Sequence, residues 1–130
     1  MPAFKPLGYN SVSPYLIVKD AAASLAFLTE VFAATPLRQF PDGEGRLMHA
    51  EAKIEDTVIM LADATPDWPA LDAHVHIYVA DVDATYAKAL AFGAESVQVP
   101  VKKQDADKRG GVKDAGGTTW WIATQMEDTV

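Results

Sequence analysis

Three histidines and one nearby glutamate carry the chemistry most readily recognised in this chain, and they occur as two pairs. The pairs are His49-Ala50-Glu51 and His74-Val75-His76, each with one residue between its members. Residues two apart in a β-strand point to the same face of the sheet, so each pair is expected to present both side chains together. Imidazole and carboxylate groups placed in this way serve either as hydrogen-bond partners of a ligand or as ligands of a divalent ion.

A metal site made of His49, Glu51, His74 and His76 is therefore one alternative for this chain. Spacing argues against it, because His74 and His76 would lie about 7 Å apart along one strand, with little to aim them at a single ion. The chain has no cysteine, which excludes disulfides, thiolate nucleophiles and cysteine-containing zinc sites. We predict that no cofactor is required, with a divalent metal ion as the alternative.

The elements that position these pairs are repeated along the chain. Residues 73–84, AHVHIYVADVDA, read as a strand running into the start of a helix, and residues 12–23, VSPYLIVKDAAA, are a near copy. The offset of 61 residues between them also carries residues 57–60 onto residues 118–121. One unit of about sixty residues, used twice, is the predicted plan of the molecule.

Each unit is predicted to have the order β-α-β-β-β. In the first, a strand at 13–19 leads through the helix N-cap Asp20 into a helix over 21–32, and strands follow at 37–40, 46–53 and 57–62. In the second, a strand at 74–79 and a helix between Asp81 and Gly93 precede a strand near 96–101, a polar segment at 102–111 and a hairpin into a strand at 118–124. The predicted fold class is α+β: tandem βαβββ modules at about 12–63 and 73–125, joined by a linker at 64–72, with curved mixed sheets around a concave cleft.

Strand alternation predicts which side chains face that cleft. The sets expected to pack on the helices are Val75, Ile77 and Val79, and Met48, Ala50 and Ala52. The open faces include Ser13, Ile17, Val58, Leu47, Glu51 and Thr119, and the cleft is expected to be lined by His49, His74, His76, Tyr15, Tyr78, Met60 and Trp121. Such a cleft is aromatic, partly polar and suited to a flat molecule.

Two further tryptophans and the arginines complete the list of candidates. Trp120 is expected in the core, and Trp68, which lies between prolines, is expected to pin the linker, with a lid over the cleft as the alternative. Arg109, Arg38 and Arg46 are placed to reach anionic groups of a ligand.

Composition limits the partners. With 130 residues and 49% hydrophobic residues, the chain is expected to form a single domain with its own core. A net charge of −7 argues against nucleic acid, and the chain shows neither a signal peptide nor an apolar run long enough to cross a membrane. A cytoplasmic protein that binds no nucleic acid and no membrane is predicted.

The spaced motifs in both units resemble one known superfamily. The tandem β-α-β-β-β units, the segment HIYVADVDATYAKALAFGAE, the HAE at 49–51 and the ending RGGVKDAGGTTWWIAT are similar to the vicinal oxygen chelate proteins, most closely to the PhnB-like and bleomycin-resistance branch of the glyoxalase group. The resemblance covers about residues 13–124. It implies homodimers that close their clefts by pairing subunits, and functions that range from isomerases and dioxygenases to drug-binding proteins.

This chain departs from the metal-dependent members of that superfamily. Their four ligand positions correspond here to Ser13, Met60, His74 and Trp121, of which only His74 is a competent ligand. We therefore predict a metal-independent protein that sequesters a planar aromatic compound, neutral or cationic, with no catalytic residues. The predicted ligand-binding residues are Trp121, Tyr78, Tyr15, His74, His49, Met60, His76 and Arg109. The alternatives are a metal-dependent lyase, isomerase or dioxygenase with a relocated site, and a structural or regulatory dimer whose cleft binds nothing.

Overall fold

The computed structural model describes residues 2–128 and contains two modules with the same order of elements. The first consists of β1 (Tyr15–Val18), α1 (Ala21–Phe32), β2 (Thr35–Pro41), β3 (Leu47–Ile54) and β4 (Thr57–Asp63). The second consists of β5 (Ala73–Tyr78), α2 (Val82–Ala91), β6 (Glu95–Lys102), β7 (Asp107–Lys113) and β8 (Thr118–Gln125). The predicted α+β class with two βαβββ modules is confirmed.

Both helices start at the aspartates that the sequence marked as caps. The side chain of Asp20 accepts a hydrogen bond of 3.0 Å from the backbone N–H of Ala23, and Asp81 accepts one of 3.1 Å from Ala84. Each aspartate thus satisfies a backbone donor that the first helical turn leaves unpaired.

Each module forms a four-stranded mixed sheet, in the order β1-β4-β3-β2 and β5-β8-β7-β6. The first strand pairs parallel with the last, and the remaining pairs are antiparallel. Tyr15 lies opposite Met60 in the first sheet, and His76 lies opposite Trp121 in the second. Because these pairs are related by the same offset of 61 residues, the repeat in the sequence is also a repeat in the register of the sheets.

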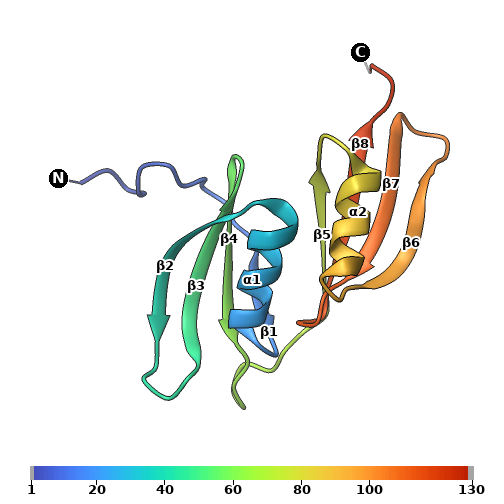
Figure 1. Cartoon of the computed structure of the whole chain (residues 1–130). Coiled ribbons are helices and arrows are strands. Elements are labelled where there is room, and N and C mark those ends of the chain that lie inside the picture. Colours follow the sequence, from blue (N-terminus) through green and yellow to red (C-terminus); the bar gives the residue numbers. More distant parts are fainter. Residues whose placement is uncertain (1, 129–130) are drawn as a thin grey trace.

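The two modules share one hydrophobic core, which lies on the helix side of both sheets. Figure 1 shows α1 and α2 next to each other in front of the sheets, and α1 and α2 are in contact. The ring of Phe32 on α1 lies 4.9 Å from that of Trp120 on β8, and Phe27 on α1 lies 6.3 Å from Phe92 just after α2. The opposite faces of the sheets are therefore left open.

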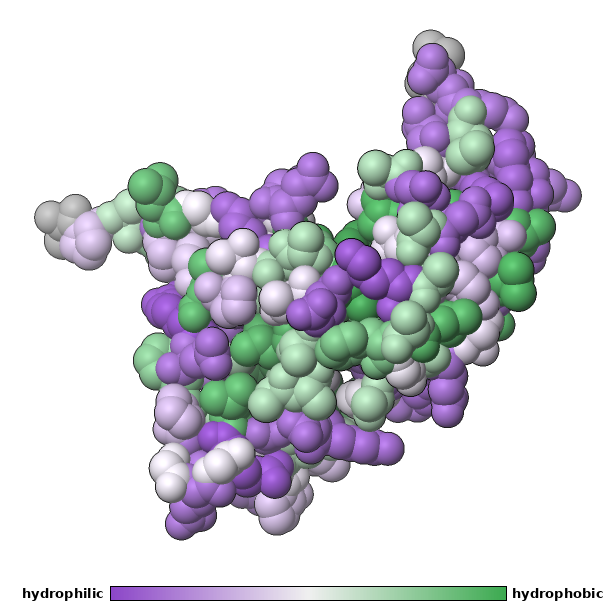
Figure 2. All heavy atoms as spheres, viewed as in Figure 1, coloured by the Kyte–Doolittle hydropathy of each residue, from purple (hydrophilic) through white to green (hydrophobic). Residues whose placement is uncertain are grey.

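Surface hydropathy follows this arrangement. Figure 2 shows hydrophobic residues gathered across the middle of the helix-bearing side, where the modules meet, and hydrophilic residues at its outer ends. Within residues 2–128, no helix is long and apolar enough to cross a membrane.

Two predictions about individual segments were wrong. Residues 107–111 of the expected polar segment lie in β7, because they pair with both β6 and β8, and Gly110 and Gly111 are buried. Met48 was expected on the helix side but is 65% exposed.

Candidate functional site

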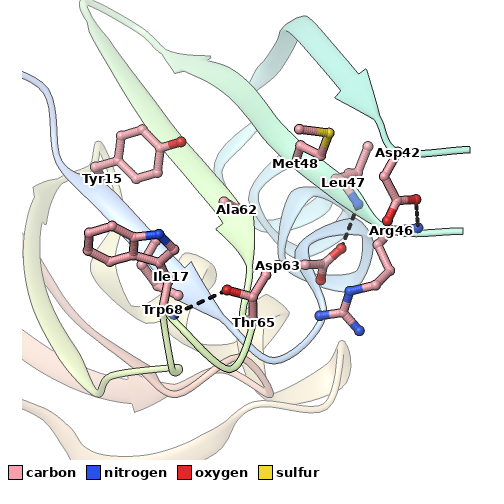
Figure 3. Close-up of a pocket in the computed structure, with 10 residues that line it drawn as sticks. All are labelled: Tyr15, Ile17, Asp42, Arg46, Leu47, Met48, Ala62, Asp63, Thr65 and Trp68. Carbon is pink, nitrogen blue, oxygen red and sulfur yellow. Dashed lines mark hydrogen bonds between the residues drawn. The ribbon is translucent and has the colours of Figure 1, made fainter. Parts of the chain in front are cut away.

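A hollow lies on module one, at the end of the sheet where the linker leaves β4. Its volume is about 580 Å³, and it is lined by Tyr15, Ile17, Asp42, Arg46, Leu47, Met48, Ala62, Asp63, Thr65 and Trp68. In Figure 3, Tyr15 and Trp68 stand on one side of Ala62, and Met48 and Leu47 stand on the other. We call this hollow the module-one pocket; it offers two aromatic side chains and several aliphatic ones to a ligand.

Trp68 belongs to a short turn of the linker. The backbone N–H groups of Thr65 and Trp68 each donate to the other residue's carbonyl, at 2.9 and 3.1 Å. Leu71 N–H then donates to Ile17 O at 3.2 Å and ties the linker to the free edge of β1. The indole itself is 69% exposed and lines the pocket, a position open to a ligand, and its role as a clamp of the linker or as a lid stays a prediction.

The charged residues of the pocket are already held by hydrogen bonds. Asp63 accepts from the N–H groups of Ala21 at 2.7 Å and Leu47 at 2.6 Å. Asp42 accepts from Glu44 at 2.7 Å and from the backbone of Arg46 at 3.2 Å. Two carboxylates and one guanidinium leave the lining slightly negative, which favours neutral or cationic ligands.

A line of polar groups runs from the pocket into the sheet. The hydroxyl of Tyr15 lies 2.8 Å from His49 Nδ1, and His49 Nε2 lies 2.8 Å from Glu51 Oε2. Glu51 is only 1% exposed, and its Oε1 also accepts from Arg38 Nε at 3.2 Å and from the hydroxyl of Tyr9. The N-terminal arm thus supplies one wall of this cluster through Tyr9.

These contacts decide the ionisation of Glu51. Burial by itself would raise the pKa of this carboxyl, but hydrogen bonds from Tyr9, His49 and Arg38, and the charge of Arg38, outweigh burial and lower the pKa below its ordinary value. The same carboxylate raises the pKa of Tyr9. Glu51 is therefore an anion at neutral pH, buried and fully hydrogen-bonded.

Module two carries a smaller hollow of about 300 Å³, centred on Arg109. The guanidinium donates to His76 Nε2 at 3.0 Å, Asp105 at 3.1 Å and Asp107 at 2.8 Å, and the hydroxyl of Tyr78 donates to Asp107 at 2.6 Å. Partial burial and the charge of Arg109 lower the pKa of His76, while the bond to Asp107 raises the pKa of Tyr78. Arg109 is held by internal partners, so it is less available to an anionic ligand than the sequence suggested.

Trp121 lies in the same module-two hollow, on the open face of β8. Its indole N–H donates to His74 Nδ1 at 3.0 Å, and the two rings are nearly parallel, with planes 8° apart. His74 and Trp121 therefore form one rigid polar-aromatic pair.

The cleft expected from the sequence is not enclosed by a single chain. Tyr15 borders the module-one pocket, where it meets His49, whereas Arg109 and Trp121 border the separate module-two hollow. The alternative metal set is likewise divided between the modules: His49 and Glu51 on one, His74 and His76 on the other. Among residues 2–128, no group of three or more histidines and carboxylates is arranged to hold a metal ion.

Four residues of these clusters were not predicted as site residues from the sequence. Tyr9 lies in an arm without periodicity, so no pattern could link it to Glu51. Asp105 and Asp107 alternate with Arg109, a signal that becomes readable once β7 is known to begin at Asp107. Asp63 appeared only as the last residue of the first module, although its carboxylate accepts hydrogen bonds from the backbone of Ala21 on α1 and Leu47 on β3.

Comparison with known proteins is decisive for the family. The family model described as Glyoxalase/Bleomycin resistance protein/Dioxygenase superfamily matches residues 8–122. The chain belongs to this superfamily. Two mycobacterial superfamily relatives are the uncharacterized protein Mb0911c of Mycobacterium bovis and the uncharacterized protein Rv0887c of Mycobacterium tuberculosis. Each is 31% identical over 129 residues, covering 91% of this chain and 85% or 76% of the relative.

Several solved structures have a similar fold. TioX from Micromonospora sp. ML1 superimposes with a TM-score of 0.75 at 21% identity, over 89% of this chain and 98% of TioX. TnmS3, an antibiotic binding protein from Streptomyces sp. CB03234, superimposes with a TM-score of 0.67 at 20% identity, over 90% of this chain and 99% of TnmS3. At such identities the likeness concerns the fold; the PhnB-like branch suggested by the motifs stays a prediction.

Proposed function

We propose that this protein binds, without metal, a planar aromatic compound that is neutral or positively charged, and sequesters it. The observation that carries the proposal is the module-one pocket, where Trp68 and Tyr15 stand opposite aliphatic side chains. A ligand ring that stacks on the aromatic ring of Trp68 or Tyr15 gains roughly 0.5 to 1.5 kcal/mol per pair, in addition to the free energy of burying apolar area. TnmS3, an antibiotic binding protein with a similar fold, supports a small-molecule ligand for this chain.

Our proposal includes a homodimer that completes the cleft. In each chain, both modules have an open sheet face. The predicted ligand residues are divided between these two faces. If module two of a partner lies across module one, its Trp121, Tyr78, His74, His76 and Arg109 come to the same ligand as Tyr15, His49 and Met60. In that arrangement Trp121 is the second stacking platform, opposite Trp68.

Titration calorimetry with three planar probes tests the proposal: neutral 7-methoxycoumarin, cationic ethidium and an anionic pyrene sulfonate. Trp68→Ala is expected to weaken binding of the neutral and cationic probes about tenfold or more, which corresponds to about 1.4 kcal/mol. Trp121→Ala is expected to do the same through the shared cleft. Phe4→Ala, at a 92% exposed aromatic outside the pocket, is the matched control and should leave affinity unchanged.

The outcomes separate the parts of the proposal. Tight binding of the anionic probe alone, or affinity unchanged in both tryptophan variants, contradicts the proposed ligand class and site. Loss of affinity in Trp68→Ala with none in Trp121→Ala confines the ligand to module one and contradicts the shared cleft.

A further inference from the structure

Tyr15 connects the module-one pocket to a buried carboxylate. Its side chain is half exposed and lines the pocket, and in Figure 3 its hydroxyl points across β4 toward β3. From that hydroxyl, hydrogen bonds of 2.8 Å lead to His49 and from His49 to Glu51. A ligand group in contact with the Tyr15 oxygen is therefore the first member of a continuous hydrogen-bonded line.

The direction of the hydrogens along this line follows from Glu51. An ionised carboxylate only accepts hydrogen bonds, so His49 Nε2 must carry the hydrogen that lies between them. A neutral imidazole has one N–H group, which leaves a lone pair on Nδ1, and the Tyr15 hydroxyl must donate to it. With its hydrogen directed at His49, the Tyr15 oxygen presents only lone pairs to the pocket. The Tyr15 oxygen therefore selects ligand groups that donate a hydrogen bond.

We propose that Tyr15, His49 and Glu51 form a relay that accepts a proton from an acidic hydroxyl group, a phenol or an enol, of a compound bound in the module-one pocket. The inference rests on the proposed function of that pocket. In the step, the ligand O–H bond breaks and its proton bonds to the Tyr15 oxygen while the proton of Tyr15 passes to His49 Nδ1. The products are a ligand oxyanion, a neutral tyrosine and an imidazolium; no electrons are gained or lost.

Glu51 is the positioning residue of the relay. Buried and held from the other side by Arg38 and Tyr9, it fixes the histidine tautomer and stabilises the imidazolium that forms. The buried aspartate of Ser-His-Asp sites acts on its histidine in the same way. Phe40, which lies on β2, packs beside His49 with the two ring centroids 5.9 Å apart.

The other charges of the pocket act on the oxyanion in opposite senses. Arg46 favours it, and Asp42 and Asp63 oppose it. Both carboxylates are directed at backbone N–H groups, which reduces their effect on a ligand. The relay supplies the additional stabilisation, since the imidazolium balances the new negative charge.

The test compares 7-hydroxycoumarin, whose neutral and anionic forms absorb at different wavelengths, with 7-methoxycoumarin, which cannot ionise. Bound to the wild-type protein, the hydroxyl probe should ionise with an apparent pKa lowered by about one unit, a tenfold change in the ionisation equilibrium. Tyr15→Phe and His49→Gln should each return that pKa to its solution value, measured at protein concentrations that saturate the hydroxyl probe. Tyr86→Phe, which removes a hydroxyl bonded to Ser96 outside this pocket, is the control and should retain the shift.

Each result decides one claim. Binding of both coumarins with no shift in ionisation overturns the relay and leaves the proposed function standing. A shift that survives in Tyr15→Phe and His49→Gln overturns the assignment of residues. Failure of both probes to bind overturns the proposed function and the relay together.

Discussion

The ring of Trp121 lies directly over the backbone of Gly111. A methyl group at residue 111 would lie 2.7 Å from Cζ3 and 2.9 Å from Cε3 of that ring, and the two residues are partners in the β7–β8 ladder. The absence of a side chain at Gly111 is thus what allows the indole to lie flat on the open face of its own sheet. Its orientation, which brings the N–H to His74, depends on a neighbour on another strand.

Gly111→Ala is expected to displace Trp121 and to lower the free energy of unfolding by about 1 to 3 kcal/mol, the usual cost of overpacking. Denaturant unfolding measures the loss, and tryptophan fluorescence reports the displaced ring. In a Trp121→Ala background the same change should cost much less, because the ring it meets is gone. A Gly111→Ala protein with wild-type stability and fluorescence would show that the ring moves freely.

Glu51→Gln is expected to destabilise the fold by about 2 kcal/mol at neutral pH, because hydrogen bonds to a buried charge are lost. The pKa of Glu51 is lowered from 4.5, so its charge contributes stability above that value, and the contribution is lost as pH falls through the folded pKa. The difference between wild type and variant should therefore be constant above about pH 5 and shrink on acidification. Unfolding curves from pH 7 to pH 3 measure it.

Glu30→Gln is the matched control, since Glu30 is exposed on α1. It should change stability little at any pH in this range. A Glu51→Gln difference that grows as the pH falls would contradict the assigned direction of the shift.

A homodimer is expected in solution, because we propose that the open faces of the two modules complete one cleft when two chains pair. Light scattering after size-exclusion chromatography at micromolar concentration should report twice the chain mass of 14.0 kDa. A strictly monomeric mass at these concentrations would count against the shared cleft, while leaving the module-one pocket as a site within one chain.

Metal removal is expected to leave ligand affinity and thermal stability unchanged. Three of the family's ligand positions hold Ser13, Met60 and Trp121, and the fourth, His74, already accepts a hydrogen bond at Nδ1 from Trp121. Treatment with a chelator, followed by metal analysis and calorimetry, checks this. Stoichiometric zinc, nickel, iron or manganese that survives dialysis, with function lost on chelation, would overturn it.

Local patterns in the sequence determined the repeated βαβββ plan. Period-two alternation and the caps Asp20 and Asp81 act over short stretches, and the offset of 61 residues repeats them, so most elements and most strand faces could be predicted. Met48 on β3 is an exception, since it is exposed where alternation placed it on the helix side. The same patterns placed Tyr15 and His49 on one open face and Trp121 on another. They failed for β7, where glycine and charged residues hide a central strand whose stability comes from its two neighbours.

Tertiary structure alone decided how the two faces relate. The repeat makes the two modules alike. Because α1 and α2 pack in one shared core, the open faces of the two modules carry separate hollows. Periodicity in the sequence does not predict how two modules pack. Tertiary structure also decided the hydrogen bonds that Tyr9 and Arg38 donate to Glu51. It likewise brought Trp68 of the linker to the module-one pocket. Such contacts depend on the path of the whole chain, because side chains without regular spacing leave no local signal of the partner they will meet.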